Sequence, residues 1–222
     1  MIFQIPDLLT AEELEQVTAQ LSQAQFVDGK LTAGWHAKLV KNNEQISRKD
    51  DSYQVLNRII QTALDRHPLV QIAVRPRAVH SLLFSRYGPG MTYGRHTDNA
   101  LMGGSAFLRS DVSFTIFLNA PEEYSGGELV VESADAETPY KLAAGSAIFY
   151  PSTTLHRVDP VTDGARLVAV GWIQSLIRDA AKREILFDLE TVRRSLFAQS
   201  GKSDEFDLLS KSVANLMRRW VD

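Results

Sequence analysis

Apolar side chains near the start of the chain recur at the spacing of an α-helix. Thr10 and Glu13 form a capping-box sequence directly before the first of these stripes. A second stripe runs over about 50–66, and we expect Pro68 to stop it because proline cannot continue a helix. The pattern predicts two amphipathic N-terminal helices. Between them, residues 30–43 alternate only in fragments and are predicted to be irregular or an edge strand.

The middle of the chain, from Arg77 to Gln174, changes to short runs of apolar and β-branched residues separated by Gly, Pro and Asp turns. No long helical stripe interrupts these runs. They are therefore expected to pair antiparallel in a sandwich or barrel. The predicted strands are 78–87, 111–119, 127–132, 147–150 and 166–174.

Helical spacing returns after about Ser175. The first apolar stripe comprises Ile177, Ala180, Ala181 and Ile185, then Leu189, Val192 and Leu196. Ser200-Gly201 interrupts it, and a last stripe runs from Phe206 to Met217. We expect one larger domain over 1–177 and a C-terminal helical extension over 178–222. The apolar stripes of the extension need cover from the β-core or from a second copy of the chain, and a homodimer through these helices is the favoured arrangement.

Composition narrows the class of protein. The chain has 222 residues, of which 44% are hydrophobic and 23% charged, as in an ordinary globular protein with a sizeable core. The net charge of −3 favours neither nucleic acid nor an anionic membrane as a partner. No cysteine is present, so disulfides and thiolate metal sites are excluded. The start of the chain lacks signal-peptide features and no run is long enough to span a membrane, so a soluble cytoplasmic protein is expected.

The chemistry-bearing residues gather after the first predicted strand. An apolar run ends at Tyr87, a Gly-Pro-Gly turn follows, and His96 and Asp98 come next on extended chain. Residues two apart in a strand point to the same side. A lone His-x-Asp pair is a weak signal because such pairs usually make a surface hydrogen bond, but His156 at a later strand end supplies a third ligand. Two histidines and one carboxylate form the facial triad of non-haem Fe(II) oxygenases.

Arg166 is a second candidate for the site. It shares one strand face with Val168, Val170 and Trp172, and three of these four side chains are apolar. The face should therefore point inward. A buried guanidinium needs an anion, and no acidic residue lies on the same face, so the pattern predicts an anionic co-substrate at Arg166.

Other candidate residues carry weaker signals. His80 alternates with apolar residues and is predicted to be a core histidine, whereas His67 lies at a helix end where a cation is favourable. His36 has no assigned role. Tyr87 and Tyr93 flank the turn before His96, and Tyr87 is the better candidate for a hydroxyl that reaches the co-substrate, because its strand enters the core.

Two glycine-containing stretches, at 126–127 and within 99–110, are predicted to be turns or loops. Gly126-Gly127 is expected to form a turn or bulge rather than a phosphate cradle, because no helix follows it. Residues 99–110 have neither strand nor helical period. A loop of this length beside a metal site is predicted to act as a lid.

The spacing Tyr-x-x-Gly-x-x-Tyr-x-x-His-x-Asp, followed by a distal His and a basic residue about ten positions later, resembles the prolyl 4-hydroxylase-like Fe(II)/2-oxoglutarate dioxygenases. The chain is more closely similar to the bacterial PKHD-type hydroxylases, the iron-uptake-associated hydroxylase group. The similar stretches span nearly the whole chain and are 26–34, 40–43, 124–129, 150–152 and 172–179.

This resemblance implies a mainly β fold with flanking helices, built on a double-stranded β-helix (jelly-roll) core. It further implies that His96, Asp98 and His156 bind Fe(II), that Arg166 binds the distal carboxylate of 2-oxoglutarate, and that ascorbate is an accessory reductant. Some relatives place a tyrosine on the strand after the lid. Residues 111–119 contain only phenylalanines as aromatic residues, so Tyr87 is the remaining hydroxyl donor toward 2-oxoglutarate.

The implied activity is hydroxylation of a C–H bond with O₂, coupled to decarboxylation of 2-oxoglutarate to succinate and CO₂. The substrate stays open between a peptide, an amino acid and a siderophore-like small molecule, and the family label does not establish it. Two rivals remain. An iron sensor without turnover would not need the anion-binding arm of Arg166, and a zinc hydrolase would need a base near its water nucleophile, for which no clear candidate is found.

Overall fold

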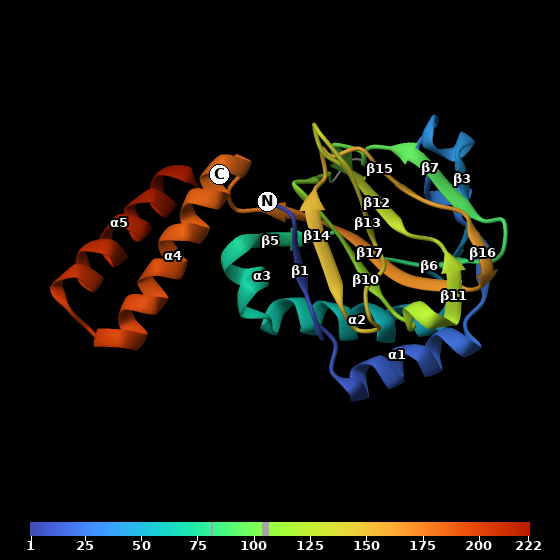
Figure 1. Cartoon of the computed structure of the whole chain (residues 1–222), viewed down its shortest axis with the longest axis horizontal. Coiled ribbons are helices and arrows are strands. Elements are labelled where there is room, and N and C mark those ends of the chain that lie inside the picture. Colours follow the sequence, from blue (N-terminus) through green and yellow to red (C-terminus); the bar gives the residue numbers. More distant parts are fainter. Residues whose placement is uncertain (81, 104–106) are drawn as a thin grey trace.

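The computed structural model describes residues 1–80, 82–103 and 107–222. Two antiparallel sheets face each other, helices α1 to α3 lie along one side, and α4 and α5 extend away from the sheets (Figure 1). The helices are α1 (Ala11–Gln23), α2 (Asp51–Arg66), α3 (Pro68–Ala73), α4 (Ala180–Ser200) and α5 (Asp204–Trp220), with short 3-10 helices at η1 (Gly29–Thr32), η2 (Ala37–Leu39) and η4 (Pro121–Glu123). Among the described residues, none of these helices is both long and apolar enough to cross a membrane.

The larger sheet contains eight strands. In spatial order they are β1 (Phe3–Ile5), β14 (Ala147–Pro151), β10 (Val112–Phe117), β17 (Arg166–Ser175), β6 (Leu83–Tyr87), β4 (Glu44–Ile46) and β2 (Phe26–Asp28), with β5 (Pro76–Val79) also paired to β17. The smaller sheet has the order β13 (Glu137–Tyr140), β12 (Leu129–Glu132), β15 (His156–Val158), β7 (Thr92–His96) and β3 (Lys41–Asn42). Two further pairs are β11 (Tyr124–Gly126) with β16 (Val161–Gly164), and β8 (Leu101–Met102) with β9 (Leu108–Arg109). This is the expected jelly-roll core with flanking helices.

The central strands of the larger sheet are buried on both faces. Along β17, Ala169 and Ile173 pack toward the helices, whereas Val168 belongs to the cluster between the sheets. Along β14, Phe149 likewise packs toward the helices, and Ile148 belongs to the cluster between the sheets. Because successive residues of a strand point to opposite faces, a strand covered on both sides needs apolar residues at nearly every position. This explains why these runs show little polar alternation.

The N-terminal helices form as their sequences predict, with one correction. The capping box of Thr10 and Glu13 is present at α1, and Arg66 at the end of α2 forms an ion pair with Glu13. Pro68 does end the second stripe, but it also occupies the first turn of α3, a helix that was not predicted. Proline fits there because the first N–H groups of a helix have no intrahelical partner.

The predicted strand 78–87 is interrupted in the structure. It becomes β5 and β6, which both pair with β17. Gly126 and Gly127 form the expected irregular turn, since both have positive φ near 70° and the β11–β16 register shifts beside Gly126. The segment 30–43 is irregular, as predicted, and consists of two 3-10 helices leading into the short strand β3.

The C-terminal helices pack around a small hydrophobic core in which Leu186 of α4 and Val213 of α5 meet Ile177, which follows β17. The two helices occupy the predicted positions, but the predicted stripe of α4 is wrong in part. Ile185 is 47% exposed, whereas the polar Glu190 is buried and accepts hydrogen bonds from neighbouring arginines of its own helix. A buried carboxylate with such partners can replace an apolar residue on the inner face.

We propose that residues 178–222 unfold as a unit distinct from residues 1–177. Replacing Leu186 by Ala removes a fully buried side chain from the small core and should cost about 2–5 kcal/mol of local stability. Amide hydrogen exchange should then accelerate in α4 and α5 while the protection of β10 and β17 stays unchanged. The neighbouring Ile185→Ala, at an exposed position, is the matched control and should change neither region. Equal acceleration in β10 and β17 would show a single cooperative unit.

Candidate functional site

A cavity of about 130 Å³ lies where the two sheets face each other. Side chains from both sheets line it, and a further part of the wall comes from the irregular N-terminal segment, at Thr32, Ala33, Gly34 and Ala37. Most of the wall is apolar, including Leu83, Phe114 and Val170. The polar and ionisable groups that the sequence singled out, His96, Asp98, His156, Arg166 and Tyr87, all line this same cavity.

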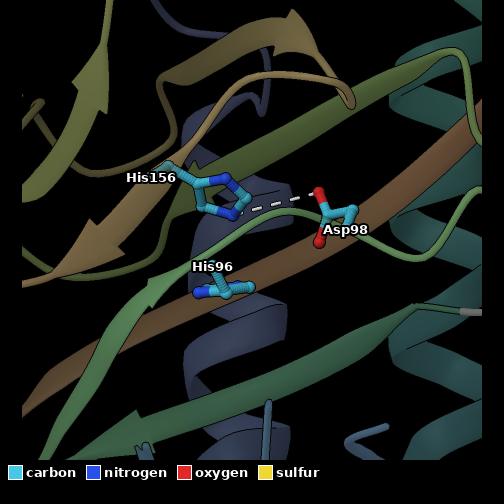
Figure 2. A group of neighbouring side chains, drawn as sticks. All are labelled: His96, Asp98 and His156. Carbon is cyan, nitrogen blue, oxygen red and sulfur yellow. Dashed lines mark ion pairs between the residues drawn. The ribbon is translucent and has the colours of Figure 1, made fainter. Parts of the chain in front are cut away.

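The strand register brings the two histidines together. In the pairing of β7 with β15, His96 lies directly opposite His156. Asp98 follows β7, two residues beyond His96, and points toward the same space (Figure 2). One potential ligand atom from each residue lies within 4.8 Å of the others, and His156 Nε2 is 3.9 Å from Asp98 Oδ2. This spacing suits three ligands on one face of a single metal ion.

Backbone carbonyls fix the tautomer of both imidazoles. His96 Nδ1 lies 2.8 Å from the Gly94 oxygen, and His156 Nδ1 lies 3.0 Å from the Thr154 oxygen. A carbonyl can only accept, so each Nδ1 carries the proton and each Nε2 keeps a free lone pair for a metal. Burial, reinforced by the nearby His156, lowers the pKa of His96 to about 4, which keeps this imidazole neutral near pH 7.

Asp98 is held by a serine pair that the sequence did not reveal. Ser113 Oγ donates to Asp98 Oδ2 at 2.6 Å, and Ser113 Oγ also lies 2.8 Å from Ser152 Oγ. Ser113 comes from β10 in the larger sheet, and Ser152 follows β14, so the contact forms only when the two sheets face each other. One oxygen of the carboxylate is thereby oriented, and the other stays free for coordination.

Arg166 is the largest fully buried side chain among the described residues, with 1% of its surface exposed. Its Nε and Nη1 atoms have no hydrogen-bond partner there, and it forms no ion pair within the described chain. Burial lowers the pKa of the guanidinium, while nearby tyrosines favour its charged form. The cation lies 5.1 Å from the centre of the Tyr87 ring and 5.5 Å from that of Phe117. A buried donor set with free N–H groups and no anion indicates a binding site for an anionic ligand.

Several aromatic side chains pack around these groups. Tyr87 pairs in register with Arg166 on the neighbouring strand, and burial raises the pKa of its hydroxyl, which therefore stays protonated. Tyr150 is equally buried, its pKa is likewise raised by burial, and its ring contacts His156 edge-on at 5.1 Å. Tyr93 stacks on His96 with ring centres 3.7 Å apart. Tyr150 was not predicted as a site residue, because its sequence context is that of an ordinary buried strand.

His80, Lys41 and the start of the 99–110 segment also line the cavity. The prediction that His80 is a core histidine is wrong: it is half-buried, lines the cavity and contacts Trp172. Lys41, only 4% exposed, was missed because it lies in the segment predicted to be irregular. Asn99 and Met102 line the cavity, but part of the predicted lid, residues 104–106, lies outside the described residues.

Comparison with known proteins agrees with this geometry. Residues 82–174, which contain all five of the singled-out site residues, match the 2OG-Fe(II) oxygenase superfamily. The fold and the site thus define a 2OG-Fe(II) oxygenase. The chain is 66% identical to a PKHD-type hydroxylase of Picosynechococcus sp. and 62% identical to one of Acaryochloris marina, in each case over 222 residues and the full length of both chains. It belongs to the PKHD-type hydroxylases, and it is an enzyme.

Solved structures support the fold at lower sequence identity. A prolyl-4-hydroxylase of Pseudomonas putida superposes with a TM-score of 0.57 at 19% identity, over 78% of this chain and 92% of that one. The viral collagen prolyl hydroxylase of Paramecium bursaria Chlorella virus-1, solved with 2OG, gives a TM-score of 0.53 at 21% identity, over 78% of this chain and 96% of that one. Both similarities place the chain on the same oxygenase fold.

Removal of either histidine should abolish stoichiometric Fe(II) binding. His96→Ala and His156→Ala each delete one imidazole from a three-ligand set, which is too large a loss for neighbouring groups to hide. Anaerobic calorimetric titration with Fe(II) would measure this, with circular dichroism to verify the fold. His36→Ala, outside the cavity lining, is the matched control. Wild-type iron affinity in both site variants would refute the ligand assignment.

Ser113→Ala should weaken metal binding without removing a ligand. Loss of the 2.6 Å hydrogen bond frees Asp98 to rotate, and loss of such supporting contacts typically costs 10–100-fold in metal affinity. The same titration measures it, and Ser133→Ala on the exposed surface serves as the control. An unchanged affinity would show that Asp98 is oriented by other contacts.

Proposed function

We propose that this PKHD-type hydroxylase is an Fe(II)- and 2-oxoglutarate-dependent dioxygenase that hydroxylates a C–H bond of a peptide, amino-acid or small-molecule substrate. One observation carries the proposal. A two-histidine, one-carboxylate cluster shares a single small cavity with a buried guanidinium that has no counter-ion among the described residues. The first suits Fe(II), and the second suits the far carboxylate of 2-oxoglutarate.

In this proposal, His96, Asp98 and His156 hold the iron on one face and leave its other positions open. The bound iron would supply activation of O₂, coupled to conversion of 2-oxoglutarate to succinate and CO₂, for hydroxylation of the substrate. Both imidazoles have Nδ1 beside a backbone carbonyl and would present Nε2 to the metal, and the Ser113 hydroxyl fixes the orientation of the carboxylate. These residues would thus be preorganised before the metal arrives.

Arg166 would orient the co-substrate. Its planar fork can donate two parallel hydrogen bonds to a carboxylate, and its free Nε and Nη1 atoms are available for this. Tyr87, whose hydroxyl stays protonated and whose ring lies beside the guanidinium, could donate a further hydrogen bond to the same carboxylate. The apolar wall formed by Val170, Phe114 and Leu83 excludes water from the reacting groups.

Two accessory features belong to the same proposal. Ascorbate would act as the accessory reductant, as the resemblance to the wider family implies. The loop over residues 99–110 would act as the lid, since Asn99 and Met102 at its start already line the cavity. Closure of such a loop over bound substrate would further limit the access of water.

Arg166→Leu should weaken 2-oxoglutarate binding by roughly two to three orders of magnitude, because losing one partner of a buried charge pair costs on the order of 3–5 kcal/mol. Arg166→Lys keeps the charge but loses the fork, so its effect should be smaller. In both variants the iron affinity should stay nearly unchanged. The measurement is the metal-to-ligand charge-transfer band during anaerobic titration of the Fe(II) protein with 2-oxoglutarate.

The control for this series is Arg178→Leu, which removes an exposed arginine and should leave the titration unchanged. Wild-type affinity in Arg166→Leu would contradict the assignment of Arg166. A wild-type protein that binds iron but shows no 2-oxoglutarate binding, and no succinate after O₂ is admitted, would contradict the proposed function itself.

A further inference from the structure

Lys41 is a buried cation in the cavity wall to which neither the metal site nor the co-substrate site assigns a role. It lies on β3, opposite Tyr93 of β7, and is 4% exposed. Its ammonium donates to Thr32 Oγ1 at 3.1 Å and lies 5.2 Å from the centre of the Tyr93 ring. An ammonium has three donors, and Thr32 is its only hydrogen-bond acceptor among the described residues.

The surroundings of Lys41 hold its ammonium in place. Thr32 Oγ1 in turn donates to Gln45 Oε1 at 2.6 Å, and Gln45 Nε2 donates to Ser85 Oγ at 3.2 Å. This chain of contacts fixes the side chain without neutralising its charge. Burial lowers the pKa of Lys41 to about 8, and the carboxylates of Asp28 and Asp98 offset this only in part. Neither carboxylate lies within ion-pair distance of the lysine in the described chain.

The charge of the cavity points to a second anion. Among its described lining residues, Lys41, Arg48 and Arg166 are cationic, and Asp98 is the single carboxylate. A divalent metal would add positive charge, and one molecule of 2-oxoglutarate, a dianion, would only cancel the charge of that metal. The lining cations would still outnumber the carboxylate. Lys41 and Arg166 also lie in different surroundings, the first beside Tyr93 and the second beside Tyr87.

The segment that leads into Lys41 carries exposed apolar side chains. Leu31, Trp35 and Leu39 are 78%, 80% and 79% exposed, and they belong to the segment whose Thr32, Ala33, Gly34 and Ala37 line the cavity. Large apolar side chains at such exposure within one short segment commonly mark a binding surface. A ligand that reached Lys41 past this segment would place an apolar group against these side chains and an anionic group inside.

We propose that the primary substrate carries a carboxylate that binds Lys41, with an apolar group that rests on the exposed side chains of Leu31, Trp35 and Leu39. Lys41 is then the residue that selects the substrate. This inference rests on the proposed function, because it takes the Arg166 site to be filled by 2-oxoglutarate. The carboxylate can be the terminal group of an amino acid or an acidic side chain within a peptide, and the two sources are separable by experiment.

The test measures binding, under anaerobic conditions, to the wild-type protein loaded with Fe(II) and 2-oxoglutarate. The first pair of probes is N-acetyl-L-leucine and N-acetyl-L-leucinamide, which share the apolar side chain and differ in the carboxylate. The second pair is the capped peptide Ac-Gly-Leu-Glu-Leu-Gly-NH₂ and its Gln analogue. In at least one pair the acid should bind about tenfold more tightly than its neutral partner, corresponding to about 1.4 kcal/mol. A preference in the first pair identifies a terminal carboxylate, and a preference in the second identifies an acidic side chain.

Three variants then test whether Lys41 causes the tighter binding of the acid than of its neutral partner. Lys41→Gln should reduce the acid-to-neutral ratio to about one, and Lys41→Arg, which keeps a cation, should retain most of it. Lys38→Gln removes an exposed lysine from the same segment and should leave the ratio unchanged. All three should bind Fe(II) and 2-oxoglutarate within about twofold of wild type.

Three results would overturn the inference: no acid preference in either pair, the full preference in folded Lys41→Gln, or a loss of 2-oxoglutarate affinity in Lys41→Gln comparable to that of Arg166→Leu. The last would place Lys41 in the co-substrate site. Each leaves the proposed function standing, because that fails only if the wild-type protein does not bind 2-oxoglutarate.

Discussion

The antiparallel register of β7 and β15 is the constraint on which the site depends. It sets His96 opposite His156, and the chain direction then delivers Asp98 to the same space two residues later. A slip of one residue would turn one imidazole to the other face of the sheet, because side chains alternate along a strand. The Gly94 and Thr154 carbonyls that contact the two Nδ1 atoms lie two residues before each histidine, so the tautomers are fixed locally by the segment that carries each imidazole.

The larger sheet makes a cavity possible inside an otherwise apolar protein. Its helix-facing side is filled by side chains such as Phe149 and Ala169, which carry much of the core. The inner side is therefore free to hold polar groups where β17 begins, at Arg166, and where β10 carries Ser113. Gly171 lies on β17 where an added Cβ would come within 2.6 Å of Phe114, so this close packing requires a glycine. Close packing on the helix-facing side of the sheet thus stabilises a sheet whose other side lines a cavity with polar groups.

The sequence predicted those parts of the site that local periodicity controls. His96 with Asp98 follows from the two-residue period of a strand, and the inward face of Arg166 follows from its apolar neighbours on β17. Ser113 and Lys41 were not predicted as site residues. Each reaches the site through contact with a segment distant in sequence, Ser113 with Asp98 and Lys41 with Tyr93, and no local pattern shows such contacts. His80 was misjudged because β5 ends before it, so the alternation on which the prediction relied does not continue into β6. In α4, Glu190 is buried through pairing with arginines of its own helix, which a hydrophobic pattern cannot show.

The guanidinium of Arg166, which has no ion-pair partner in the part of the chain that the structure describes, has a consequence for stability. Folding without an anion leaves a desolvated cation in place, so the ligand-free chain is less stable than it would be with that charge compensated. Any anion that binds the folded state alone adds RT ln(1 + [L]/Kd) to the free energy of unfolding. The fraction of chains open to proteases therefore falls as the anion becomes more abundant.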